Sequence, residues 1–498
     1  MTRLSPDRTP VIIGLGEIKD RPEDPACGLE PLALMAEALR RADADAGGGV
    51  LGRLDAIDVV NSVSWPYADV PGALCARLGV APRHRNYGPI GGETPVRFLH
   101  EAAGRISRGE SAVAAVVGAE AQYSVAAAHK RGIDLPWTAK HPNPAPRNRD
   151  YLAELARRHG LDMPIRVYPL YENATASAWG LTPRAAMRES AEVWSAFSEV
   201  AAQNPGAWLP RRFDAAEIAT ASPANRMIAW PYPKLMTANP LVNQGCAVIL
   251  CSLAVARAAG VPAHRVIPVR GGAWANEPKD VMQRPHFASA PAMDVVLEAA
   301  LDMVDGDPAR FAHREFYSCF PCVPKMARRK LGLPADVVPS VAGGLTFHGA
   351  PLNNYMLHAA CGMVRALRHD PGEVGLLYGQ GGFVTNHHSL VLGGAAGTPL
   401  VARDRQAEAD ARRASPPPLV EGRSGAATVE THTVVFAPDG TPDYGAVILR
   451  LPDAARTIAR VPREDTGTLA ALMADDITAI GRIGHLSPGQ EGLQQWTI

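Results

Sequence analysis

The stretch GGLTFHGAPLNNYMLHAACG occupies residues 343–362 and joins a glycine-rich turn to an apolar helix. Gly344 and Gly349 lie in the turn, and Tyr355 and His358 follow at the start of the helix. Glycines let the backbone approach a ligand closely and offer N–H groups to a developing negative charge on oxygen. The pattern indicates an active-site loop at the end of a strand.

Around this stretch, segments of strand character alternate with segments of helical periodicity. Strands are predicted at 10–18, 56–63, 111–121, 264–274, 314–320, 373–378 and 387–394, helices at 29–46, 94–110 and 182–203, and a strand followed by a helix at 243–260. Such alternation is typical of βαβ-type units. We therefore expect an α/β protein of two βαβ-type halves, with a largely parallel sheet covered by helices on both faces.

The composition along the chain divides it into parts. We expect an N-terminal half at 1–265 that includes a cap insertion at about 125–235, and a C-terminal half at 266–402. Residues 403–424 are charged and then rich in proline, which predicts a linker. Residues 425–498 alternate apolar and polar side chains around a Pro-Asp-Gly turn, which predicts a hairpin within a small β-domain or barrel.

The overall charge argues against several partners. Fifty Lys and Arg residues balance fifty Asp and Glu residues, so no net charge attracts nucleic acid or an anionic membrane. No window approaches the roughly 18 apolar residues of a spanning helix, and the N-terminus lacks the pattern of a signal peptide. Seven cysteines without that signal indicate free thiols in a reducing compartment. These features predict a cytoplasmic protein without nucleic-acid or membrane partners.

Two histidines near the opening stretch are candidates for acid–base chemistry. His348 lies in the glycine-rich loop, and histidine is the side chain that most readily supplies a general base near neutral pH. His358 lies on the following helix, where a satisfied core histidine is the alternative interpretation. His387 and His388 begin a strand, so one of these two must face away from any site that they share.

Other candidate residues each have a structural alternative. Gly381 and Gly382 follow a predicted strand, as Gly344 does, and could equally form tight turns. Cys319 and Cys322 form a Cys-x-x-Cys without a second ligand pair nearby, so no metal site is expected. We expect core thiols or, for Cys319, part of a pocket wall.

Four segments, in this order, resemble landmarks of the thiolase superfamily. VVGAEAQYS (116–124) resembles the Gly-Gly-x-Glu-x-Met-Ser strand end, and EFYSCF (315–320) resembles the His-Asp-Cys-Phe segment of sterol-carrier-type thiolases. GGLTFHGAP (343–351) resembles the Gly-Gly…Gly-His-Pro loop, and YGQGGF (378–383) the final Cys-x-Gly-Gly-Gly loop. The chain is similar to a thiolase body over about residues 8–395. Its tail is similar to the added domain of thiolase-like proteins that are commonly labelled acetyl-CoA acetyltransferases.

This resemblance implies a layered αβαβα fold with an added OB-like C-terminal domain. It also implies that three catalytic parts are missing. The histidine of the Gly-His-Pro loop falls on Ala350, the cysteine of the final loop falls on Tyr378, and the nucleophilic cysteine has no counterpart between Gly91 and Thr94. Thiolysis through an acyl-cysteine is therefore not expected, because that route needs a thiolate nucleophile.

The expected activity is acyltransferase-like chemistry of lipid metabolism on acyl-CoA thioesters. We expect a carbon–carbon bond to form or break by Claisen or retro-aldol chemistry, with His348 as the base and Tyr378 as an acid. His358 and Tyr355 complete the candidate catalytic set. The alternative function is a catalytically silent acyl-CoA-binding protein, or a subunit that presents its site to a partner.

The expected ligand is CoA or an acyl-CoA as substrate, with no permanently bound cofactor. Candidate substrate contacts are Gly344, Gly349, Asn353, Gly381, Gly382, Cys319, Arg147 and Arg149. Arg131 and Lys140 add to the basic cluster of the cap, for which a solvated loop is the alternative interpretation. The assembly is expected to be a homodimer, with a monomer as the other possibility.

Overall fold

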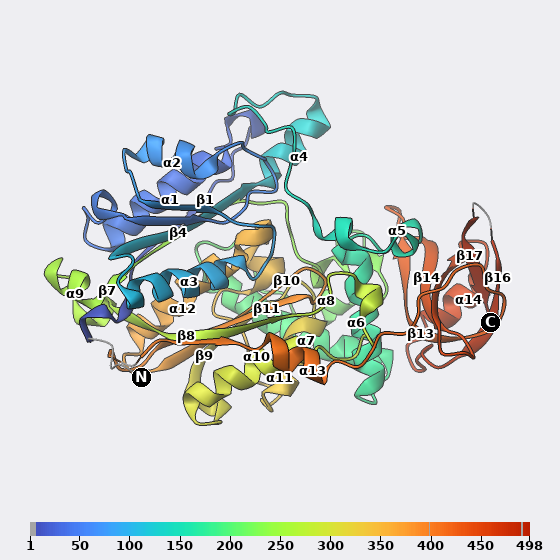
Figure 1. Ribbon diagram of the computed structural model, residues 1–498. Helices are drawn as coiled ribbons and strands as arrows, with labels where there is room; N and C mark the ends of the chain where they lie inside the picture. Colours follow the sequence, from blue (N-terminus) through green and yellow to red (C-terminus); the bar gives the residue numbers. More distant parts are fainter. Residues whose placement is uncertain (1–5, 398, 490–491) are drawn as a thin grey trace.

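One large sheet runs through the main body of the protein (Figure 1). The computed structural model describes residues 6–397, 399–489 and 492–498. In spatial order the strands of the sheet are β3 (His84–Tyr87), β2 (Ala56–Val59), β4 (Val113–Ala121), β7 (Asn243–Ser252), β1 (Pro10–Lys19), β8 (Ile267–Asn276), β11 (Asn386–Gly393), β10 (Val374–Gly381) and β9 (Phe311–Phe316), with β12 (Val401–Asp404) beside β8.

The sheet consists of two halves that meet at a short junction. Strand β1 of the first half pairs with β8 of the second only at Val11 with Pro268 and Ile12 with Ile267. Helices α3 (Thr94–Arg108) and α12 (Tyr355–His369) contact strands of both halves and each other. They form the central layer between the two halves.

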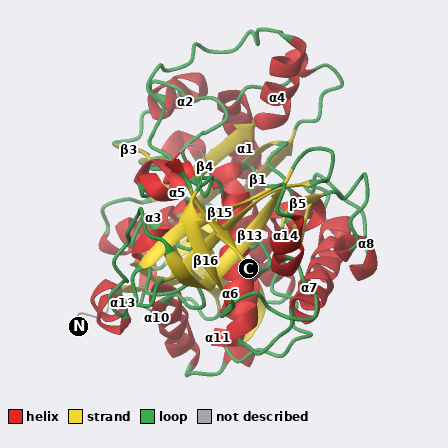
Figure 2. Ribbon diagram, turned by 90° about the vertical axis from the view of Figure 1, so that its right-hand side faces the viewer, coloured by secondary structure: helices red, strands yellow, loops and turns green. Residues whose placement is uncertain are grey.

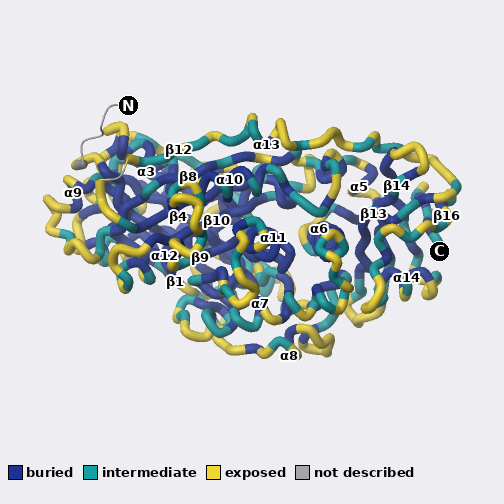
Figure 3. The backbone as a smooth tube through the Cα atoms, turned by 90° about the horizontal axis from the view of Figure 1, so that it is seen from below, coloured by how far each residue is buried: buried dark blue, intermediate teal, exposed yellow. Residues whose placement is uncertain are grey.

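Further helices cover the outer faces. Helix α1 (Pro31–Asp45) packs on β1, β4 and β7, and α10 (Pro291–Leu301) packs on β8 and β11. Helix α11 (Cys322–Lys330) lies next to α10 and β9, while α2 (Val70–Leu78) and α9 (Leu253–Ala258) flank the first half. The order helix, sheet, helix, sheet, helix gives the expected αβαβα layers, and buried backbone fills them (Figure 3).

Glycines in β1 explain how closely α1 packs. A Cβ atom on Gly14 would lie 3.1 Å from the carbonyl carbon of Ala42, and one on Gly16 would lie 2.6 Å from the backbone nitrogen of the same residue. Only glycine allows this approach of strand to helix. The tight packing therefore depends on the Gly-Leu-Gly segment of the first strand.

The strand directions differ from the expectation. The sheet is mixed rather than largely parallel: β2–β3, β2–β4, β9–β10 and β8–β12 are parallel, whereas β1–β7, β1–β8, β4–β7, β8–β11 and β10–β11 are antiparallel. The strand at 387–394 follows its predecessor through a tight turn and so must run back along it. Alternation of helices and strands predicts crossovers, but it does not identify such hairpins.

The insertion between β4 and β7 is mostly helical. It contains α4 (Gln122–Arg131), α5 (Glu154–Arg158), α6 (Pro164–Ala178), α7 (Pro183–Gln203), α8 (Ala215–Ala219), β5 (Met227–Ala229) and β6 (Tyr232–Pro233). Helix α7 contacts the glycine-rich turn at 344–348. A fully buried ion pair between Glu172 of α6 and Lys325 of α11 ties the insertion to the body. Tyr232 donates a hydrogen bond of 2.7 Å to the same carboxylate.

The C-terminal part forms a closed β-barrel (Figure 2). Its elements are β13 (Gly425–Phe436), β14 (Pro442–Arg450), β15 (Arg456–Pro462), α14 (Thr466–Leu472), β16 (Ile483–Pro488) and β17 (Gln494–Thr497). The strands follow each other as β13, β14, β15, β17, β16 and again β13, with the helix between β15 and β16. This five-stranded barrel agrees with an OB-like domain, and the predicted hairpin is β13–β14. Strand β5 of the insertion pairs with β13 and extends the barrel sheet.

The predicted linker at 403–424 is partly ordered secondary structure. It begins within β12 and continues as α13 (Gln406–Arg412), which packs on α10 and β8. Arg413 donates a hydrogen bond of 2.8 Å to the buried Glu277 of the body. The charges that suggested a solvated linker therefore hold it against the body. None of the described helices is both long and apolar enough to cross a membrane.

Candidate functional site

The N-terminus of α3 meets the segment at 343–362, which contains the glycine-rich turn and the start of α12. The backbone N–H of Gly91 donates a hydrogen bond of 3.2 Å to Asn353 Oδ1, and Asn353 Nδ2 donates one of 3.1 Å to the carbonyl of Asn61. Asn353, predicted to contact substrate, is buried and joins the beginnings of α3 and α12 instead. The two helices thereby converge on one point between the sheet halves.

No side chain fits at Gly92, just before α3. A Cβ atom on this residue would lie 2.5 Å from the carbonyl oxygen of Gln380 and closer still to the Tyr317 hydroxyl. Real Cβ atoms essentially never approach other atoms within 3.0 Å. The segment where a nucleophile was sought thus lacks a cysteine, and at Gly92 it also lacks the space for one. Tyr317 occupies that space, and burial raises the pKa of its hydroxyl well above the usual value.

Glu93 lies next to this closed position. Its side-chain Oε1 accepts a hydrogen bond of 2.9 Å from Asn386 Nδ2, while Oε2 is buried and has no hydrogen-bond partner among the described residues. A Cβ atom on Gly381 would collide with Oε2, so the glycine at 381 is needed for the carboxyl group to lie there. Burial raises the pKa of Glu93, which brings its protonation closer to neutral pH.

A cavity of about 1010 Å³ extends from Glu93 along α3. Its walls come from α3, β8, β11, the turn after β10 and the cap loop between Ala145 and Tyr151. Charged groups of both signs line it, including Arg97, Lys279, Glu101 and Glu277. The volume suits a ligand of drug size or larger, and two buried carboxyl groups, those of Glu93 and Glu277, lie among the lining residues.

The predicted basic contacts of the cap lie outside this cavity wall. Asn148 lines the cavity, but its neighbours Arg147 and Arg149 do not, and the Arg149 guanidinium lies 3.9 Å from Asp150. Arg131 lies 3.8 Å from Asp24, and Lys140 stands 4.0 Å above the Trp65 ring. These four residues are exposed, Arg131 is the last residue of α4, and their contact with CoA stays a prediction.

The side chain of Tyr378 lies on the face of β10 that points away from the start of α3. Along β10 the side chains alternate, so that Gly379 and Gly381 face Glu93 and the start of α3, whereas Tyr378 points to the opposite face. Its hydroxyl hydrogen-bonds to His387 Nδ1 at 2.7 Å. The prediction that Tyr378 replaces a cysteine beside the α3 N-terminus is therefore wrong. Among the predicted glycines of this strand end, Gly381 packs against Glu93 and Gly382 lines the cavity.

Cys319, which was predicted to contact substrate, is a poor nucleophile because burial keeps its thiol protonated. Cys319 is buried, and burial raises the pKa of its thiol to about 12. Its sulfur lies 3.9 Å from Gln380 Oε1. A thiol with this pKa is almost entirely protonated at pH 7, and only the thiolate is nucleophilic. All seven cysteines of the chain are free, and Cys319 is a core thiol that is not among the described residues lining either large cavity.

Three of the predicted catalytic residues, His348, His358 and Tyr355, cluster elsewhere. The ring centroids of His348 and His358 are 5.0 Å apart, and those of His348 and Tyr355 are 5.8 Å apart. The Tyr355 hydroxyl is engaged, because it donates a hydrogen bond of 2.6 Å to Glu315 and accepts one of 3.0 Å from the N–H of Gly344. Tyr355 and Gly344 thus fix the shape of the turn.

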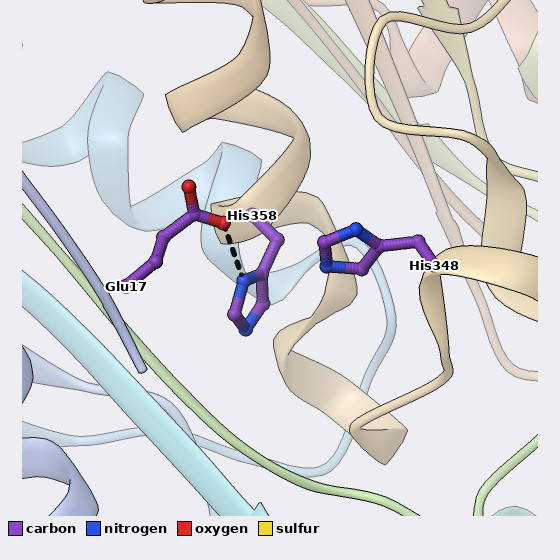
Figure 4. A group of neighbouring side chains, drawn as sticks. All are labelled: Glu17, His348 and His358. Carbon is purple, nitrogen blue, oxygen red and sulfur yellow. Dashed lines mark hydrogen bonds and ion pairs between the residues drawn. The ribbon is translucent and has the colours of Figure 1, made fainter. Parts of the chain in front are cut away.

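Glu17 completes this cluster, although no pattern in the sequence pointed to it. Its carboxylate Oε1 lies 2.7 Å from His358 Nδ1 (Figure 4), and its Oε2 forms an ion pair with Arg365. Burial alone would raise the pKa of Glu17, but the hydrogen bond from His358 and the nearby positive charges outweigh it and lower the pKa to about 2. Burial lowers the pKa of His348 to about 3. At neutral pH the first group is therefore an anion and the second a neutral imidazole.

A second cavity, of about 980 Å³, opens beside this cluster. Glu17 and His358 line it together with residues of α7 and the loop at 204–206. His348 is fully buried and is not among the described residues that line either large cavity. Gly349, at φ 109°, forms the turn behind it, where a Cβ atom would lie 2.8 Å from Gln244 Oε1. The predicted base is thus packed behind His358 rather than beside the α3 N-terminus.

Comparison with known proteins finds a family model that matches the tail and a solved structure similar to the whole chain. The additional C-terminal domain of type 1 thiolase-like proteins matches residues 406–491. The monomeric SCP2-thiolase-like protein type 1 of Mycobacterium smegmatis is 29% identical over 99% of both chains, with a TM-score of 0.82. No curated protein matches the sequence.

Two more distant structures share the fold of the body. The Ltp2-ChsH2(DUF35) aldolase is 18% identical, covering 78% of this chain and 99% of its own, with a TM-score of 0.58. The dimeric peroxisomal thiolase of Saccharomyces cerevisiae is 12% identical, covering 78% of this chain and 98% of its own, with a TM-score of 0.56. Both matches leave about a fifth of this chain uncovered.

Proposed function

We propose that this chain, a thiolase-like protein with an added C-terminal domain, makes or breaks a carbon–carbon bond beside the thioester of an acyl-CoA without forming an acyl-cysteine. One observation carries the proposal. No side chain fits at Gly92, within the segment where a nucleophile was expected, while the neighbouring Glu93 lines a large cavity and has a buried carboxyl oxygen without a hydrogen-bond partner among the described residues. Buried carboxyl groups with raised pKa values are suited to acid–base catalysis.

In the proposed reaction, the carboxyl group of Glu93 alone carries the proton. In the cleavage direction, the Glu93 carboxylate takes the proton of a β-hydroxyl group, and the bond between Cα and Cβ breaks. The β-carbon leaves as a carbonyl product, and the electron pair moves into the enolate of the thioester. The protonated Glu93 then returns its proton to Cα. Tyr317, which its raised pKa keeps protonated and whose hydroxyl lies against Gly92, is our candidate donor for the enolate oxygen.

The substrate class is argued from the fold and the cavity. A cavity of about 1010 Å³ suits a thioester with its pantetheine arm, and Arg97 and Lys279 on its wall supply positive charge for phosphates. A solved protein of the same fold is described as an aldolase, which supports this class of reaction by analogy. We place the reaction in acyl-CoA lipid metabolism in the cytoplasm, without a permanently bound cofactor.

A silent binding role is the second candidate. It is favoured by the closed position at Gly92, since the usual nucleophile is absent. One solved protein of this fold is monomeric and another is dimeric, so we propose a monomer or a homodimer as the assembly of this chain. Binding without any product would support this second role.

Thermal unfolding with ligands tests whether the cavity binds acyl-CoA. We expect Tm to rise with millimolar CoA, acetyl-CoA or acetoacetyl-CoA, because a ligand at 100 times its Kd stabilises the folded state by about 2.7 kcal/mol. Ala402→Trp on the wall of the first cavity should abolish the rise. The matched change Ala196→Trp on the wall of the second cavity should leave it intact. No rise with any of the three thioester-related ligands would remove the acyl-CoA assignment.

A further inference from the structure

We propose that Glu17, His348 and His358 form a binding site for a divalent transition-metal ion beside the second cavity. This inference does not depend on the proposed reaction, because the site lies apart from Glu93 and opens into a different cavity. The three residues come from distant parts of the chain, namely β1, the glycine-rich turn and α12. The fold alone brings them together.

The geometry suits a small ion. One ligand atom from each of Glu17, His348 and His358 lies within 4.8 Å of the other two, and Figure 4 shows the His358 ring between the carboxylate and the His348 ring. A transition metal bonds nitrogen and oxygen at about 2.0–2.2 Å, which holds neighbouring ligands roughly 3–4 Å apart. Two imidazoles and one carboxylate are a donor set typical of Zn²⁺ and Fe²⁺.

Unpartnered nitrogen atoms support a ligand at this place. The Nε2 atoms of both His348 and His358 are buried and have no hydrogen-bond partner in the described part of the chain. A buried polar atom without a partner costs about 1–3 kcal/mol, so two of them in one cluster call for an explanation. The low pKa values of Glu17 and His348 leave both residues without a proton to displace at neutral pH.

Neighbouring polar groups already orient the three ligands. Arg365 binds the outer oxygen of Glu17, which leaves Oε1 toward His358, and Asn204 Nδ2 lies 3.3 Å from His348 Nδ1. Such outer contacts commonly fix metal ligands. The charge of Arg365 also opposes a cation, so this residue limits the affinity. Glu17 and His358 line the second cavity, so the cluster lies beside accessible space.

Titration of the metal-free protein with Zn²⁺ tests the site. After treatment with a chelator, calorimetry should show one Zn²⁺ bound per chain, and Co²⁺ should give a visible absorption band. Glu17→Gln and His358→Gln should each weaken Zn²⁺ binding by roughly tenfold or more. Arg365→Ala should strengthen it, since the opposing charge is removed. His369→Gln, an exposed histidine on the same helix, is the matched control and should leave binding unchanged.

Three results would overturn the site. They are the absence of stoichiometric binding by the wild type, an affinity that is the same in Glu17→Gln and His358→Gln as in the wild type, or loss of binding in His369→Gln. Circular dichroism and Tm identify variants that do not fold. If a variant of a buried residue does not fold, the wild-type Co²⁺ spectrum still tests the site. The variant Arg365→Ala also tests it, because the Arg365 side chain is partly exposed.

Discussion

Replacement of Glu93 by Gln is expected to lower kcat by roughly 10²- to 10⁴-fold, the usual contribution of a general acid–base group. The amide keeps the shape of the side chain and can retain a contact with Asn386, but it cannot carry the proton between the β-hydroxyl group and Cα. Because Gly381 leaves room for this side chain, the substitution should not disturb the packing. Release of a shorter acyl-CoA from a β-hydroxyacyl-CoA, followed by chromatography, measures the effect.

The control for this variant is Glu37→Gln on the surface of α1, which should keep the wild-type rate. The Tm rise with acyl-CoA should persist in Glu93→Gln, since the residue moves a proton and does not hold the CoA moiety. Unchanged kcat in Glu93→Gln would remove this carboxyl from the reaction. A folded variant that loses both binding and turnover would indicate a role in binding rather than in proton transfer.

A cysteine introduced at Gly92 is expected to destabilise the protein and to form no acyl-cysteine. Gly92→Cys places a Cβ atom against the Gln380 carbonyl and the Tyr317 hydroxyl, so the surrounding loops must shift. Inserting atoms into a packed region costs about 1–3 kcal/mol, and we expect a loss of stability in that range in urea unfolding. We also expect no acyl-cysteine, since the thiol has no space to meet a thioester.

Gly52→Cys is the matched control, because a Cβ atom on Gly52 has no atom within 4 Å. This variant should unfold at nearly the same urea concentration as the wild type. Intact-protein mass spectrometry after incubation with acetyl-CoA, followed by peptide mapping, reads out acylation of Gly92→Cys. An added acetyl mass on the introduced thiol of this variant would show that the site is open, contrary to the structure.

Much of the architecture follows from local patterns in the sequence. Hydrophobic periodicity predicts many strands and helices of both halves but not α2, β3, α10 or α11. The Pro-Asp-Gly turn predicts the β13–β14 hairpin, since that signal lies within a few residues. Strand direction in the large sheet could not be predicted in this way, because it depends on which distant strands pair. The ordered β12 and α13 were missed because their stability comes from contacts with the body, such as Arg413 with Glu277.

The sequence predicted only those parts of the candidate site whose residues lie close together along the chain. The missing cysteine drew attention to residues 91–94, and the acidic residue at 93 was visible there as a candidate that sequence reasoning passed over. Glu17 could not be found, because it meets His358 only through the packing of β1 against α12. The orientation of Tyr378 required the register of β10, since one residue decides which face of a strand a side chain occupies.

The central claim is carbon–carbon bond chemistry on an acyl-CoA without an acyl-cysteine. The most direct test incubates the wild-type protein with β-hydroxyacyl-CoA thioesters of several chain lengths and follows the small products and the intact protein by mass spectrometry. We predict that a shorter acyl-CoA accumulates while the mass of the protein stays that of the unmodified chain. A protein that carries the acyl mass, or the absence of product from every thioester, would contradict this account.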